Sequence, residues 1–225
     1  MSESVKLTAQ DGHELDAYVV RPIGKPVAGL VLVQEIYGVN AHIRSVADGY
    51  AADGFVVIAP AIFDRIERGV QLNYSAEGSK TAYELMNKLD PKTALFDIEA
   101  ALGWVREATG GLTAGVVGFC YGGLLAWLSA TRLDPAAAVG YYPGGIGRVA
   151  EETPKAPVML HIGTEDSHIP RSDVEKVRAA HPEVQVFDYA GAEHAFNRDV
   201  GQTYDTVAAK LARERTVAFL RQYLT

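Results

Sequence analysis

The only cysteine of this 225-residue chain, Cys120, lies within Gly118–Gly123, which reads GFCYGG. This is the spacing of a nucleophile elbow, G-x-S-x-G, with sulfur in place of the hydroxyl oxygen. In such an elbow a strand turns sharply into a helix, and small neighbours let the two elements approach each other. The helix N-terminus favours the thiolate, which is the nucleophilic form. The alternative is a buried cysteine that serves only as a small hydrophobic side chain.

Three further groups that could serve a cysteine nucleophile each follow an apolar run of sequence. They are Glu35, Asp166 and His194. Because the carboxyl ends of parallel strands meet at one edge of a sheet, we expect these groups to lie near Cys120. The order cysteine, acid, histidine is that of a nucleophile–acid–base triad. We therefore predict that His194 takes the thiol proton and that Asp166 fixes the tautomer of its imidazole.

The acid and the oxyanion-binding groups are less tightly specified than the nucleophile. Glu165 or Asp188 could serve as the acid, although Asp166 lies further round its turn and has the better reach toward the last loop. The backbone N–H groups of Ile36 and Tyr121 are expected to hold the developing oxyanion, because both follow strand ends beside the nucleophile.

The remaining histidines are expected to be surface or packing residues, since no nucleophile pairs with them in chain order. They are His13, His42, His161, His168 and His181. His161, Glu165, Asp166 and His168 together suggest a metal site only weakly, because their spacing matches no zinc signature. We therefore predict no metal.

Apolar runs and helical periodicities alternate along the chain. This pattern predicts an α/β fold with a mostly parallel sheet between helix layers, in one domain over residues 1–225. Strands are predicted at 5–8, 15–20, 28–34, 55–59, 114–119, 136–142, 156–162 and 184–189. Helices are predicted from Asn40, around 81–88, from Asp90, at 121–131, from a capping box of Ser172 and Glu175, and at 202–224, with Val207, Leu211, Leu220 and Leu224 facing inward.

The composition narrows the class of protein. The chain is 48% hydrophobic and 22% charged, with a net charge of −7. An acidic balance argues against nucleic-acid binding, and no apolar run approaches the roughly 18 residues of a membrane helix. The N-terminus lacks the pattern of a signal peptide, so we expect a cytoplasmic protein. A single cysteine excludes an intrachain disulfide framework.

The motifs together resemble the dienelactone hydrolase family of the α/β hydrolases. The resemblance rests on residues 34–40 (QEIYGVN), on the cysteine elbow and on the loops of Asp166 and His194, and it extends over nearly the whole chain. It implies an α/β-hydrolase fold and hydrolysis of a carboxylate-bearing enol-lactone through an acyl-cysteine intermediate, without metal or cofactor. The family's triad falls on Cys120, Asp166 and His194. Its additional glutamate falls on Glu35, which would hold the thiol proton until substrate binding redirects it.

The same resemblance is weaker in the substrate-binding wall. Arg198 matches one arginine that clamps the substrate carboxylate, and Tyr83 matches a wall residue. The second arginine is replaced by Ser79, and an expected tryptophan is replaced by Met86. Lys80 could supply the missing charge, although a solvated surface lysine is the simpler interpretation.

Other functions remain open at this point. They are hydrolysis of other small esters or lactones in a changed pocket, a thiol-based redox role for Cys120, and a non-catalytic binding scaffold. The missing resolving cysteine argues against the redox role. The expected partner is a small anionic lactone or ester, with no nucleic acid and no membrane. The natural substrate and the choice between a monomer and a small homo-oligomer are not specified by the sequence.

Overall fold

One mixed sheet of eight strands runs through the computed structural model, which describes residues 2–225, in the order β1-β2-β4-β3-β5-β6-β7-β8. The pairs β1–β2 and β2–β4 are antiparallel, and the other neighbours are parallel. The strands are β1 Ser2–Thr8, β2 Glu14–Val20, β3 Ala28–Val33, β4 Phe55–Pro60, β5 Ala114–Phe119, β6 Ala138–Tyr141, β7 Val158–Gly163 and β8 Gln185–Tyr189. The predicted α/β class with a mostly parallel sheet is confirmed.

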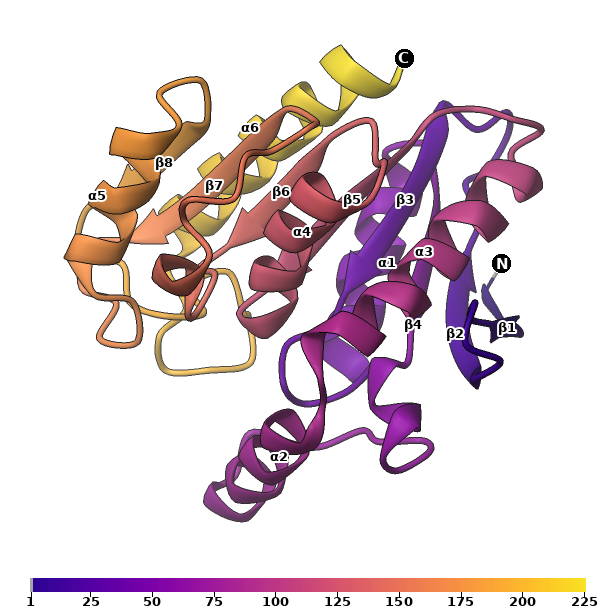
Figure 1. Ribbon diagram of the computed structural model, residues 1–225, viewed down its shortest axis with the longest axis horizontal. Coiled ribbons are helices and arrows are strands. Elements are labelled where there is room, and N and C mark those ends of the chain that lie inside the picture. The colour runs from indigo at the N-terminus through magenta and orange to yellow at the C-terminus, as the bar shows by residue number, and fades with distance from the viewer. Residues whose placement is uncertain (1) are drawn as a thin grey trace.

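Helices cover both faces of this sheet (Figure 1). They are α1 Ala41–Ala52, α2 Ala76–Lys88, α3 Pro91–Ala108, α4 Tyr121–Arg132, α5 Arg171–Ala180 and α6 Thr206–Leu224, with short 3₁₀ helices η1 Ile62–Arg65 and η2 Ile146–Arg148. Helices α3 and α4 pack together over the central strands on one face, whereas α1 and α6 lie on the other (Figure 1). Helix α2 projects beyond the sheet edge where the strands β3 and β5 end (Figure 1). No helix within residues 2–225 has the length and apolarity needed to cross a membrane.

The sequence explains why the central elements form where they do. Strands β3, β4 and β5 are buried along their whole length, as expected for continuous apolar runs in a parallel sheet covered on both faces. The side chain of Asn40 caps α1 by accepting from the Ile43 N–H, and Asp90 caps α3 by accepting from the Lys92 N–H ahead of a first-turn proline. These caps fix the helix starts beside the strand ends that carry the candidate site.

Two helix predictions are wrong in detail. Helix α5 begins at Arg171 after Pro170, whose side chain makes no capping hydrogen bond, so Ser172 lies inside the helix and forms no capping box. Helix α6 begins later than predicted, after the cap Asp205. In its first two turns Ala208 and Ala212 form the buried face, so Val207 and Leu211 point toward solvent and are 77% and 38% exposed. Leu220 and Leu224, further along α6, are buried as predicted.

Candidate active site

Cys120 lies at the sharp corner between β5 and α4, as the elbow motif predicts. Its φ of 54° and ψ of −114° depart from ordinary helix and strand backbone, and it occupies the N-cap position of α4. A Cβ on Gly118 would lie 1.9 Å from the carbonyl oxygen of Gly122, and one on Gly122 would lie 2.4 Å from the carbonyl oxygen of Gln34. The elbow therefore requires glycine at both positions.

Strained backbone is concentrated around this corner. Cys120, Tyr142 (φ 35°) and Ala195 (φ 61°) are the only non-glycine residues with positive φ among residues 2–225. Each such position costs on the order of 1–3 kcal/mol and persists only where the surrounding structure imposes it. Tyr142 packs against the imidazole of His194, with ring centroids 4.8 Å apart, and Ala195 follows His194 in the chain. All three strained residues therefore border one small region.

The acid beside His194 is Asp166. Its Oδ2 lies 2.7 Å from Nδ1 of His194, and its other oxygen accepts from the backbone N–H of His168 at 2.8 Å. The alternative acids are placed elsewhere, because Glu165 is exposed to solvent and Asp188 pairs with arginines of α5. The side chain of Asp166 is fully buried, so this hydrogen bond is shielded from water.

The charge state of His194 follows from its neighbours. Burial lowers the pKa of His194, but hydrogen bonds with Asp166 and Cys120, together with their negative charge, outweigh it and raise that pKa to about 10. The imidazolium is therefore the favoured form near neutrality when the thiolate is present, as expected for a thiolate–imidazolium pair.

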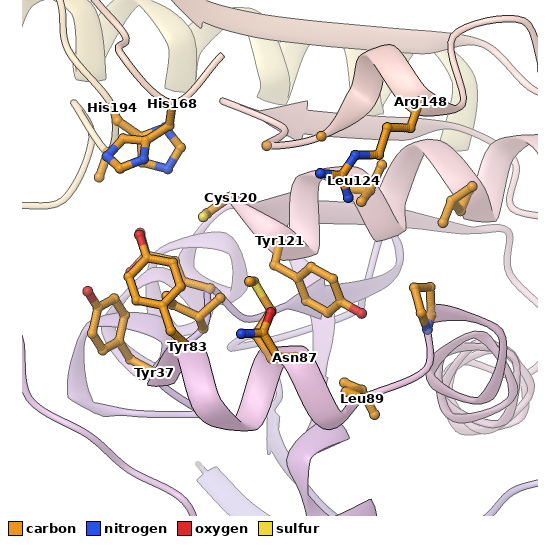
Figure 2. Close-up of a pocket in the computed structure, with 18 of the residues that line it drawn as sticks. Tyr37, Tyr83, Asn87, Leu89, Cys120, Tyr121, Leu124, Arg148, His168 and His194 are labelled. Atoms are coloured by element: carbon orange, nitrogen blue, oxygen red, sulfur yellow. The ribbon is translucent and has the colours of Figure 1, made fainter. Parts of the chain in front are cut away.

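His168 is exposed, as predicted for a surface histidine. It also lines the same cavity as Cys120 and His194, a position that its spacing in the sequence did not indicate. Its ring centroid lies 4.7 Å from that of His194. Figure 2 shows the two imidazoles side by side above Cys120. The turn that supplies Asp166 therefore also brings a second imidazole to the site.

The backbone N–H groups predicted to hold an oxyanion belong to two residues of the cavity that contains Cys120. Ile36 follows the end of β3, and Tyr121 is the first residue of α4. Within residues 2–225, neither amide donates one of the hydrogen bonds found in turns, loops and caps. Both residues line the cavity that contains Cys120. The two groups are thus available to a ligand oxygen, and the N-terminus of α4 adds a favourable dipole.

Glu35 is buried and is held by two residues. Its Oε1 lies 3.8 Å from Nη1 of Arg198, and its Oε2 accepts from the hydroxyl of Tyr74 at 3.1 Å. The guanidinium of Arg198 also lies over the ring of Tyr74, 4.0 Å from its centroid. Asn40 donates to the hydroxyl of Tyr74 at 3.1 Å. In this structure the carboxylate of Glu35 is thus engaged by Arg198 and Tyr74.

A cavity of about 740 Å³ joins these groups, since Glu35, Cys120, His194 and Arg198 all line it. Figure 2 shows Tyr37 and Tyr83 on one side, His194 and His168 on a second, and Tyr121 and Leu124 of α4 on a third. The volume lies within the range of ordinary small-molecule sites.

The residues of the changed wall divide into two groups. Tyr83 and Met86 of α2 line the cavity, whereas Ser79 and Lys80 do not. The hydroxyl of Ser79 shares a hydrogen bond of 3.1 Å with that of Tyr37, and Lys80 is exposed. The suggestion that Lys80 supplies the missing charge therefore finds no support in its position. Within residues 2–225, no group of three or more histidine, cysteine or acidic side chains is arranged to hold a metal ion.

Several site residues were missed by the sequence reasoning. Tyr74 lies in an irregular polar stretch with no periodic signal, and Tyr142 reads only as the end of a buried strand. Arg148 of η2 also lines the cavity. The one usable signal was topological, because Tyr142 and Arg148 follow β6 at the same sheet edge as Cys120.

The strand order, the strained cysteine elbow and the buried acid–histidine pair define an α/β hydrolase. Comparison with known proteins makes the assignment narrower. Residues 15–224 match the dienelactone hydrolase family, and the chain belongs to that family.

Relatives of known name agree with this assignment. The chain is 33% identical to the carboxymethylenebutenolidases of Pseudomonas putida and Pseudomonas knackmussii, over 98% of this chain and 96% of each of theirs. The crystal structure of a candidate dienelactone hydrolase from Klebsiella pneumoniae superposes with a TM-score of 0.85 at 28% identity, covering 99% of both chains. The chain is therefore a member of the dienelactone hydrolase family that is similar to these carboxymethylenebutenolidases over nearly its whole length.

Proposed function

We propose that this protein hydrolyses small carboxylate-bearing enol-lactones or esters through a Cys120–His194–Asp166 triad. The observation that carries the proposal is the common cavity, in which a cysteine on a strained elbow shares one wall with a histidine bound to a buried carboxylate. The family assignment and the name of the Pseudomonas relatives support lactone or ester hydrolysis as the reaction class.

The chemistry proceeds in two halves. The thiolate of Cys120 attacks the carbonyl carbon, and the N–H groups of Ile36 and Tyr121 stabilise the oxyanion of the tetrahedral intermediate. The carbon–oxygen bond of the ester then breaks, and the imidazolium of His194 protonates the leaving oxygen. Water next attacks the thioester and gives a proton to His194. The carbonyl–sulfur bond breaks, the acid product leaves, and Cys120 returns to its starting state.

Glu35 and Arg198 are assigned supporting roles. By the family pattern, Glu35 would accept the thiol proton of Cys120 in one state of the enzyme. In this structure Arg198 and Tyr74 bind the carboxylate, and we assign this arrangement to the alternative state. An anionic substrate that binds Arg198 would compete with Glu35 for the guanidinium, which couples substrate binding to the position of Glu35.

The cavity wall departs from the family pattern at two positions that bear on the choice of substrate. Ser79 contributes no charge, and Met86 replaces a rigid aromatic surface with a flexible thioether. Hydrolysis of related esters or lactones of different shape is therefore included in the proposal. A redox role for Cys120 has no resolving cysteine to support it.

The test is a hydrolysis panel of carboxylated lactones and neutral aryl esters with the wild type, Cys120→Ala and His194→Ala. We expect turnover by the wild type and a loss of at least a thousandfold in kcat in each variant. Mass spectrometry of quenched reactions should detect an acyl group on Cys120. Wild-type turnover in either variant would refute the triad, and peroxide-dependent oxidation without any hydrolysis would favour the redox role.

A further inference from the structure

The cavity extends well beyond the sulfur, along one face of α4. Four residues of this helix line it at intervals that place them on the same face, namely Tyr121, Leu124, Leu128 and Arg132. From Cys120 to Arg132 the helix axis rises by about 18 Å. The middle of this wall is apolar and is faced by Val149 beyond η2. We call this part of the cavity, bounded by Tyr121, Leu124, Leu128 and Val149, the α4 groove.

The arginines that line the cavity differ in the ion pairs and hydrogen bonds that they already make. Arg198 is paired with Glu35, and Arg132 forms two hydrogen bonds with Glu152, at 2.9 and 2.5 Å. Arg148 makes no ion pair and no side-chain hydrogen bond with any other residue in the range 2–225. Its guanidinium is thus free to bind a ligand anion.

Two other charged residues of the cavity, Lys92 and Glu193, affect where a ligand anion would bind. Lys92 also lines the cavity and makes no ion pair within residues 2–225, but the carboxylate of Asp90, which caps the same helix, lines the cavity two positions before it. Glu193, a third acidic lining residue, follows β8 on the same loop as His194. Arg148 therefore combines a free guanidinium with a segment, residues 144–149, that contributes no acidic side chain to the cavity.

The position of Arg148 is fixed by η2. Gly145, with φ 82°, starts this short helix, and a Cβ built on it would lie 3.8 Å from Leu124. Figure 2 shows the guanidinium of Arg148 reaching over Leu124 toward the cavity, on the side away from α2. Leu124 lies about one helical turn beyond Cys120, which is a rise of about 6 Å along α4.

We propose that the α4 groove binds the acyl chain of the substrate and that Arg148 binds a carboxylate at the far end of that chain. This inference rests on the proposed function and specifies its substrate class as monoesters or lactones of extended dicarboxylic acids. The acyl group occupies the groove because the leaving oxygen must face His194, which lies on the other side of Cys120 (Figure 2). A guanidinium suits this role, since it binds a planar carboxylate through two parallel hydrogen bonds.

The test compares two series of p-nitrophenyl esters of increasing chain length. One series comprises monoesters of succinic, adipic and suberic acid, and the other comprises butyrate, hexanoate and octanoate. For each pair, the ratio of kcat/KM for the carboxylated ester to that for the neutral ester reports recognition of the carboxylate. We expect Arg148→Gln to lower this ratio at least tenfold for the longest pair, the suberate monoester and the octanoate, mainly through KM. Arg148→Lys should restore part of the ratio.

Lys80→Gln is the matched control, because it removes the same charge from an exposed residue outside the cavity. It should change the ratio by less than twofold. An unchanged ratio in Arg148→Gln, or an equal loss in Lys80→Gln, would overturn the inference.

Calorimetric binding of suberate to Cys120→Ala, with and without Arg148→Gln, separates this inference from the proposed function. Tenfold weaker binding on loss of Arg148 supports the subsite even without turnover, and equal binding refutes it.

Discussion

The site contains two buried carboxylates, each beside a cationic side chain, and the two pairs differ in how tightly they are held. Asp166 lies 2.7 Å from the imidazole of His194, and its second oxygen is fixed by a backbone N–H. Glu35 lies 3.8 Å from Arg198 and is otherwise held by the hydroxyl of Tyr74. The first pair is a short hydrogen bond, whereas the second is a looser ion pair.

This difference suits different tasks. A histidine that moves protons needs one tautomer and one orientation throughout the cycle, which a short buried hydrogen bond provides. A carboxylate that exchanges partners needs contacts weak enough to be replaced by a substrate anion. The two carboxylates also differ in how far along the chain their partners lie. Asp166 accepts from a backbone N–H within its own turn, whereas Tyr74 and Arg198 reach Glu35 from separate loops.

The largest expected effect on kcat comes from removing the negative charge of Asp166, the carboxylate of the tighter pair. Asp166→Asn should lower kcat by about a hundredfold to ten-thousandfold, because the imidazole loses both its orientation and the stabilisation of its charged form. The hydrogen bond with Asp166 is the largest contribution that raises the pKa of His194 to about 10. In the variant that pKa should fall, so the alkaline limb of the kcat profile should move to lower pH. Kinetics across pH 5 to 11 would measure both effects.

The linked effect on stability has a definite sign. A histidine whose folded-state pKa lies above its unfolded value stabilises the fold fully below the unfolded pKa and loses this contribution as pH rises through about 10. The difference in unfolding free energy between the wild type and Asp166→Asn should therefore narrow toward alkaline pH. Glu165→Gln, on the same turn but exposed, is the matched control. Equal losses of kcat in the two variants would contradict the assignment of Asp166.

A smaller effect is expected from the looser pair. Glu35→Gln keeps the shape of the side chain but leaves Arg198 without its anion and replaces a charged acceptor for Tyr74 with a neutral one. The free energy of unfolding should fall by about 1–3 kcal/mol, as measured by urea denaturation. On carboxylated esters, kcat should fall more than on neutral esters, because the coupling between substrate anion and Glu35 is lost.

Glu193→Gln provides the comparison for this prediction, since Glu193 lines the same cavity but is exposed. Its stability should match that of the wild type within about 0.5 kcal/mol. If Glu35→Gln and Glu193→Gln behave alike in both stability and substrate preference, the ion pair of Glu35 with Arg198 has neither the structural nor the substrate-dependent role assigned to it.

The tighter pair is also the one that sequence reasoning could predict. Asp166, His194 and Cys120 each follow a strand of the parallel part of the sheet, and parallel strands bring their carboxyl ends to one edge regardless of separation along the chain. Apolar runs that must be buried predict the sheet and most of its strand bounds. The glycines around Cys120 predict the elbow. These features depend on local pattern, which is why they are predictable.

Contacts made across the cavity could not be predicted in the same way. Tyr74 reaches Glu35 from an irregular loop, and His168 lies against His194 only because of how its turn is folded. The outward orientation of Val207 and Leu211 has a similar cause, since α6 buries the face that carries Ala208 and Ala212 instead. Each of these depends on tertiary placement, which residue spacing does not encode.

The smallest effect we predict separates the two contacts that Tyr74 makes. Tyr74→Phe removes the hydroxyl that donates to Glu35 and keeps the ring under the guanidinium of Arg198, whereas Tyr74→Leu removes both. Tyr74→Phe should cost about 1–2 kcal/mol of unfolding free energy. Tyr74→Leu should cost about 0.5–1 kcal/mol more for the cation–π contact, in addition to any loss of packing. Repeating both measurements with Arg198→Gln removes the cation, so the difference between the two Tyr74 variants should shrink by that amount. If it does not shrink, the ring of Tyr74 contributes only packing, and the hydroxyl alone positions Glu35.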